Sequence, residues 1–215
     1  MTLREKIKIP KYTLGEELTN AITHGIGAIF SIVTLILCLI RSNTTMSIIS
    51  SLIYGISSII LFTISCVYHS LKTNNGKRVL RIIDHCSIYL LIAGTYTPYT
   101  LILLPQPLGL IVFIVNWCSA ALGITLNAID LNKYKVFSMI LYLVMGWMVL
   151  ISLKDFLAYV PKEGMILMFI GGILYTIGSV FYLIGKNKKY MHSIFHIFVL
   201  IAAILFFFSI YLYVI

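Results

Sequence analysis

Five side chains that could bind a metal or take part in catalysis lie where apolar stretches of this chain meet its basic loops. Ser65 and His69 lie in SCVYH, Asp84 lies in RIIDHC, and His192 and His196 lie in HSIFH. The members of each pair are four residues apart, so they share a face if their segment is helical. Ionisable groups inside apolar segments are energetically costly and usually mark a functional site. We therefore expect these five residues to form one site.

Three histidines beside one carboxylate are a typical set for zinc. Three neutral imidazoles, here His69, His192 and His196, leave a tetrahedral Zn2+ ion one position for water, as in catalytic sites. Zinc lowers the pKa of its water towards about 7, and we predict that the catalytic residues Asp84 and Ser65 handle the proton and hydrogen-bond the water or a ligand. HSIFH lacks the glutamate of the HExxH proteases, so the base must come from elsewhere. The spacing alone does not separate zinc from iron or manganese.

Each motif also has a purely structural interpretation. Histidine pairs at helix starts are often interfacial, an aspartate there often pairs with the helix dipole, and a serine in a membrane helix often bonds the preceding turn. A second polar stripe, Glu16, Asn20 and His24, runs at i, i+4 and i+8. We predict that it surrounds the metal ligands or packs helices rather than binding the metal. His85 points about 100° away from Asp84 on an ideal helix, so we leave it out of the ligand set.

The composition is that of an integral membrane protein. The chain has 215 residues, of which 60% are hydrophobic and 11% are charged, and its mean hydropathy is +1.01. Soluble domains average about 45–50% apolar and about 25% charged residues. The formal net charge of +9 comes from short loops, where basic residues set orientation in a membrane. We therefore predict no nucleic-acid partner, and a single domain over residues 1–215.

Seven apolar runs are long enough to cross a bilayer, where they must be helical. They cover about residues 21–40, 47–69, 83–104, 108–127, 134–153, 164–184 and 192–214. The first run follows a basic tail like that of a signal peptide, but its length and the lack of an A-x-A-like cleavage site predict a retained span. The fold class is thus an all-α bundle of seven transmembrane helices. Pro98 should kink the third helix, and Gly171 and Gly178 should allow close packing of the sixth.

Lysine and arginine are distributed unevenly between alternate loops. The N-terminal tail and the second, fourth and sixth loops contain 13 of these residues, and the other loops contain three. This bias predicts a cytoplasmic N-terminus and a C-terminus outside. With that orientation His69, Asp84 and His192 lie at the cytoplasmic ends of three helices, so the site forms in one leaflet.

Five motifs follow one another in a fixed order along the chain. They are N-x-x-x-H in the first span, S-x-x-x-H at the end of the second, the aspartate that opens the third with GTYTP after it, G-x-x-Y-x-x-G-x-x-F in the sixth and H-x-x-x-H at the start of the seventh. This ordered set, which extends over nearly the whole chain, resembles the hemolysin III branch of the progestin and adipoQ receptor family. The resemblance implies seven helices with a cytoplasmic N-terminus and zinc held by His69, His192 and His196. It also implies that Asp84 holds the zinc water and that Ser65 is the serine of the second motif.

The resemblance implies several functions. The family is grouped with alkaline ceramidases as membrane hydrolases, bacterial relatives are linked to membrane-lipid homeostasis, and the hemolysin label implies lysis of red cells. We predict a zinc-dependent intramembrane hydrolase of lipid amide or ester bonds in the plasma membrane, with membrane lipids as its partners. A non-catalytic sensor with structural zinc and a pore-forming cytolysin remain alternatives. The outer halves of the predicted spans lack acidic and basic residues, which argues against a pore in a monomer.

Overall fold

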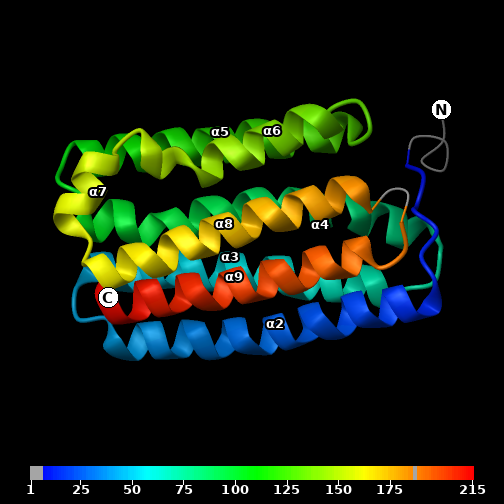
Figure 1. Ribbon diagram of the computed structural model, residues 1–215, viewed down its shortest axis with the longest axis horizontal. Helices are drawn as coiled ribbons and strands as arrows, with labels where there is room; N and C mark the ends of the chain where they lie inside the picture. Colours follow the sequence, from blue (N-terminus) through cyan, green and yellow to red (C-terminus); the bar gives the residue numbers. More distant parts are fainter. Residues whose placement is uncertain (1–6, 186–187) are drawn as a thin grey trace.

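The computed structural model describes residues 7–185 and 188–215, and the regular secondary structure in these ranges is entirely helical. The elements are α2 (Leu14–Arg41), α3 (Thr45–Ser70), α4 (Asn75–Pro98), the π-helix η1 (Tyr99–Leu103), α5 (Leu108–Asp130), α6 (Lys135–Gly146), the 3-10 helix η2 (Met148–Leu150), α7 (Leu153–Tyr159), α8 (Lys162–Ile184) and α9 (Met191–Tyr213). The long helices lie side by side in an elongated bundle (Figure 1). The segment before α2 and the start of α9 lie at one end of this bundle, and the C-terminus lies at the other.

Six helical segments within the described residues are long and apolar enough to cross a membrane. They are α2, α3, α4 together with η1, α5, α8 and α9. The prediction of an all-helical integral membrane protein is therefore confirmed. Helix α2 begins at Leu14 rather than at residue 21, because Thr13 and Glu16 form a capping box that starts the helix earlier.

Helix α2 shows how the bundle is adapted to lipid. Its exposed face carries large aliphatic side chains such as Ile22 and Ile26, whereas its buried face carries Asn20, His24 and Thr34. A helix on the surface of a soluble protein has the opposite arrangement. The polar residues of α2 therefore lie in the bundle interior, which is where polar groups of membrane helices are usually found.

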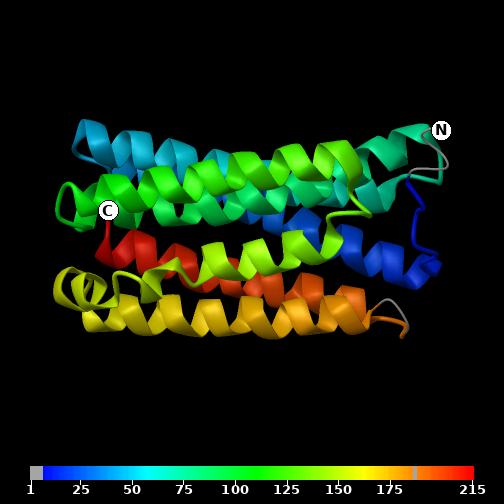
Figure 2. The same ribbon diagram turned by 90° about the horizontal axis from the view of Figure 1, so that it is seen from above.

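The predicted fifth span, residues 134–153, is not one continuous helix. Helix α6 ends at Gly146 after 12 residues, and the chain continues through η2 and α7 towards the far end of the bundle (Figure 2). The hydroxyl of Tyr96 holds the break: it donates to the carbonyl of Gly146 at 2.7 Å and accepts the N–H of Val149 at 3.1 Å. Backbone groups freed inside a membrane protein need such partners.

Two further predictions concern helix shape and packing. At Pro98 the α-helix α4 ends and the chain continues as the π-helix η1, so the proline changes the helix type at the position of the predicted kink. Gly171 brings α8 close to α9, since a Cβ atom there would lie 2.8 Å from the ring of Phe206. These contacts set the spacing of the helices that carry the site.

Candidate metal centre

His69, His192 and His196 come together in the interior of the bundle. Their exposed fractions are 3%, 9% and 1%, and one ring nitrogen of each lies within 4.8 Å of the other two. His69 stands in the last turn of α3, and the other two stand in the first turns of α9. Helix α2 packs against both α3 and α9, so it holds the two halves of the cluster together.

The arrangement of these histidines fits a metal ion. Two nitrogens bound to one zinc at about 2.05 Å with tetrahedral geometry lie about 3.3 Å apart, and the Nε2 atoms of His192 and His196 are 3.0 Å apart. The Nε2 atom of His69 is buried and has no hydrogen-bond partner among the described residues. Buried polar atoms are nearly always paired, so a cation would satisfy this nitrogen. The three histidines can therefore hold a metal ion.

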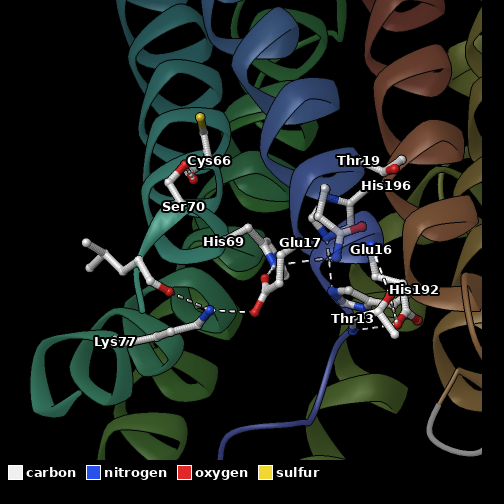
Figure 3. Close-up of polar contacts among 12 residues, drawn as sticks. Thr13, Glu16, Glu17, Thr19, Cys66, His69, Ser70, Lys77, His192 and His196 are labelled. Carbon is white, nitrogen blue, oxygen red and sulfur yellow. Dashed lines mark hydrogen bonds and ion pairs between the residues drawn. The ribbon is translucent and has the colours of Figure 1, made fainter. Parts of the chain in front are cut away.

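Glu17 of α2 holds the ring of His69, although the sequence pattern did not single it out. Its Oε2 atom lies 2.6 Å from Nδ1 of His69, and its Oε1 atom accepts a hydrogen bond from the ammonium of Lys77 at 2.5 Å (Figure 3). Lys77 is only 2% exposed. A carboxylate at Nδ1 keeps the imidazole proton on that atom and leaves the lone pair of Nε2 for a metal. Glu17 and Lys77 thus orient one of the three histidines.

The spacing along α2 contains the signal that points to Glu17. On an ideal helix with 100° per residue, Glu17 lies about 20° from His24, whereas Glu16 lies about 80° from it. The structure places Glu16 at the start of the helix, where its carboxylate accepts the backbone N–H groups of Thr13 and Tyr190, each at 2.8 Å. Glu16 therefore ties α2 to the segment that precedes α9.

Asn20 and His24 lie directly against the cluster. The amide nitrogen of Asn20 is 3.4 Å from Nδ1 of His69, and the ring of His24 stacks on that of His196 with centroids 3.7 Å apart. Both side chains are buried. His85 lies apart from the three clustered histidines but lines a neighbouring cavity. Helix α2 thus places two of the three residues of the polar stripe, Asn20 and His24, against the cluster.

Asp84 and Ser65 line a cavity that begins at the histidines. The cavity has a volume of about 130 Å3 and runs between α4, α6, α8 and α9, from His192 and His196 to the region of Trp147. Beyond its polar end the walls consist mainly of leucine, isoleucine, valine and aromatic side chains. The Ser65 side chain lies near the Asp84 carboxylate. The structure therefore joins the polar cluster to an apolar space.

Residues 7–13, which we call the N-terminal strap, run along the end of the bundle at which α9 begins (Figure 1). The ring of Tyr12 stacks on His192, with centroids 5.1 Å apart and 13° between the planes. Arg78 and Arg81 of α4 donate hydrogen bonds to backbone carbonyls of the strap. Burial raises the pKa of the Tyr12 hydroxyl, which therefore stays neutral. The strap covers the cluster from the end of the bundle.

Comparison with known proteins gives a match over most of the chain. Residues 12–207 match the family described as Haemolysin-III related. The chain belongs to this family. Its relatives include the Hemolysin-3 homolog of Bacillus subtilis (strain 168), 39% identical over 205 residues that make up 94% of this chain and 96% of the relative.

Two other relatives extend the comparison. Hemolysin-3 of Bacillus cereus is 36% identical over 215 residues, 99% of this chain and 98% of that protein. The Monocyte to macrophage differentiation factor of Homo sapiens is 29% identical over 213 residues, 94% of this chain and 86% of that protein. The resemblance to the hemolysin III branch is therefore confirmed, and the protein is a multi-pass membrane protein of the haemolysin-III family.

Proposed function

We propose that this haemolysin-III family member is a zinc-dependent hydrolase that cleaves an amide or ester bond in membrane lipids. The observation that carries the proposal is the position of the histidine cluster and Asp84 at the polar end of an apolar cavity. An apolar cavity with a few convergent polar groups suits a ligand that is mostly apolar. An acyl chain in the cavity would bring the bond between chain and headgroup to the polar end.

The residues of the centre have distinct roles in this proposal. Zinc, when bound by His69, His192 and His196, would supply Lewis acidity towards water and a carbonyl oxygen. Asp84 would accept a proton from the attacking water and return it to the leaving amine or alcohol. Ser65 would orient the Asp84 carboxylate, and the apolar walls of the cavity would keep bulk water away from the reacting bond.

Lipid turnover by the purified protein tests the proposal. Protein reconstituted in vesicles with amide- and ester-linked lipids should release fatty acid, and Asp84→Asn should keep its metal but lose turnover by about 10²- to 10⁴-fold. Asp130→Asn is the matched control, because Asp130 is exposed at the end of α5. Full turnover in Asp84→Asn would refute its role. No turnover of any lipid by metal-loaded wild type would refute the hydrolase.

A non-catalytic sensor with structural zinc is the second candidate. The positions of the three histidines favour this function. His69 lies on α3, and His192 and His196 lie on α9; both helices pack against α2. A metal ion held by all three would therefore link separate helices. This function predicts that metal binding stabilises the fold while lipid turnover is absent. A pore-forming cytolysin, the function that the name Hemolysin-3 of a relative suggests, predicts dye release from liposomes by the purified protein.

We also propose one domain with seven membrane crossings, a cytoplasmic N-terminus and an external C-terminus, located in the plasma membrane. Helix α6 with η2 and α7 would form the fifth crossing (Figure 2). The bias of lysine and arginine towards alternate loops supports this orientation. In a variant without native cysteines, Lys133→Cys should react with a thiol reagent only from the cytoplasm, and Lys154→Cys only from outside. Labelling of both from one side would contradict the proposed topology.

A further inference from the structure

The apolar cavity ends part-way along the bundle. Its lining follows α4 from Asp84 to Tyr96, which corresponds to about 18 Å at about 1.5 Å per residue. On four of the surrounding segments, the lining residue farthest from the histidines is Tyr96 of α4, Trp147 directly after α6, Gly172 of α8 and Phe206 of α9. These four residues, which we call the end wall, mark where the cavity stops.

Direct contacts hold the four residues of the end wall at one level of the bundle. The Tyr96 hydroxyl donates to the backbone carbonyl of the residue before Trp147 at 2.7 Å. A Cβ atom on Gly172 would lie 3.7 Å from Cη2 of Trp147, so the indole lies against α8 at this glycine. The neighbouring Gly171 lies against Phe206, since a Cβ atom there would lie 2.8 Å from the phenyl ring.

The bundle is closely packed beyond the end wall. Tyr96 and Phe206 belong to one buried hydrophobic cluster, whose other members include Met148, Val149, Met168, Phe207 and Ile210. Met148 and Val149 directly follow Trp147 in the chain, and neither lines the cavity. Protein interiors of this kind leave no room for additional groups without rearrangement. A hydrocarbon chain that enters from the histidines therefore stops at the end wall.

The indole of Trp147 is tied to α8 by its own hydrogen bond. Its Nε1 atom donates to the hydroxyl of Thr176 at 2.9 Å, and that hydroxyl donates to the backbone carbonyl of Gly172 at 2.8 Å. The backbone N–H of Trp147 donates to the carbonyl of Leu143 at 2.9 Å, a bond that any residue except proline can make. A smaller side chain at this position would therefore keep the backbone of the break and lengthen the cavity.

We propose that Trp147 sets the length of the acyl chain that this protein accepts, because its indole closes the far end of the cavity. This inference rests on the proposed hydrolase function, since it names which lipids that site takes. An extended hydrocarbon chain grows by about 1.25 Å per carbon, given C–C bonds of about 1.5 Å. A length of about 18 Å along α4 therefore matches a chain of about 14 carbons. Longer chains have to displace the indole or leave carbons outside the cavity.

The chain has two tryptophans, Trp117 and Trp147, so fluorescence can report on the end wall directly. In Trp117→Phe all tryptophan emission comes from Trp147. The probes are saturated fatty acids of about 10–20 carbons, each with a bromine atom on its last carbon, because bromine quenches an indole that it touches. Added to the full-length protein in detergent, they should quench Trp147 most strongly at about 14 carbons, and about 2-fold less at either end of the series.

The reciprocal variant Trp147→Phe is the matched control for fatty acid dissolved in the detergent. Its emission comes from Trp117, which donates to the hydroxyl of Thr97 at 3.2 Å and does not line the cavity. Quenching of Trp117 should not depend on chain length. The same length optimum at both tryptophans, or no optimum at Trp147, would overturn the proposal.

Two substitutions in the end wall should move the length preference in opposite directions. Preference is measured by displacing a fluorescent fatty acid with unlabelled fatty acids of increasing length. Trp147→Ala should favour chains longer by about two to four carbons, because removal of a large side chain leaves a cavity. Gly172→Val should favour chains shorter by about two carbons, since its added methyl groups lie beside the indole. If Trp147→Ala does not fold, Trp147→Leu provides the comparison.

Trp117→Ala is the matched control for these substitutions, because it removes the same ring and a hydrogen bond to a threonine outside the cavity. It should keep the wild-type preference, and a shift as large as that of Trp147→Ala would overturn the proposal. Length-selective binding by a wild type that hydrolyses no lipid would reject the hydrolase and leave the end wall as the limit of a lipid-binding cavity. Hydrolysis at equal rates for all chain lengths would keep the hydrolase and overturn the role of Trp147.

Discussion

Replacement of Glu17 by glutamine tests how the metal centre is held. The two oxygens of Glu17 lie 2.6 Å from Nδ1 of His69 and 2.5 Å from the ammonium of Lys77. Loss of a group that supports a ligating histidine lowers metal affinity by about 10- to 100-fold. Glutamine keeps the size of the side chain and one acceptor oxygen, so we expect the lower end of this range for Glu17→Gln and the upper end for Glu17→Ala.

The same substitution leaves Lys77 without its carboxylate. Breaking a buried ion pair costs about 3–5 kcal/mol, but the side chain of Glu17 is 19% exposed, and screening by solvent reduces the loss to about 2 kcal/mol. For a chain of this length, that loss corresponds to a fall of about 5 °C in melting temperature. Adding Lys77→Met removes the unpaired charge, so the double variant should recover stability without recovering metal affinity.

Titration against a zinc chelator measures the affinity, and a thermal scan of the same samples measures the stability. Glu16→Gln is the matched control, since the Glu16 carboxylate accepts the backbone N–H groups of Thr13 and Tyr190. It removes the same charge from the neighbouring position of α2. If Glu17→Gln binds zinc as tightly as Glu16→Gln does, our assignment of Glu17 to His69 is wrong.

The other predictions concern the strap, the break after α6 and metal removal. Tyr12→Ala should increase severalfold the rate at which a chelator strips metal, because the ring covers His192; Tyr12→Phe should not, and equal rates in both would contradict the covering role. Tyr96→Phe leaves two backbone groups at the break without their partner, so the melting temperature should fall by about 5 °C, corresponding to about 2 kcal/mol. A wild-type melting temperature in that variant would show that the Tyr96 hydroxyl does not stabilise the break after Gly146. Chelation should lower the melting temperature of the wild type but not that of His69→Ala, and equal shifts would place the stabilising metal elsewhere.

Much of the candidate centre follows from helix geometry and can therefore be predicted from sequence. His192 and His196 are one turn apart, and His69 ends one helix at the same end of the bundle where His192 opens another. The choice between Glu16 and Glu17 depends on the rotation of α2 about its axis. An i, i+4 series through Asn20 leads to Glu16, whereas the contact with His69 is made from the i, i+3 position.

The features that sequence did not predict depend on long-range contacts. Residues 134–153 are apolar throughout, and hydropathy reports the length of such a run but not an interruption in it. The break after Gly146 is held by a tyrosine fifty residues earlier, Tyr96. The N-terminal strap likewise depends on Arg78 and Arg81, more than 70 residues further along the chain. Contacts of this kind exist only once the helices have packed.

The metal content of the detergent-purified protein tests the central claim most directly. Mass spectrometry should find about one zinc ion per chain in the wild type and in His85→Ala, whose histidine lies in the cavity wall outside the cluster of three. The variant His192→Ala/His196→Ala should contain none. Equal zinc in all three proteins, or no zinc in the wild type after reconstitution with zinc, would contradict the assignment of a metal centre to His69, His192 and His196.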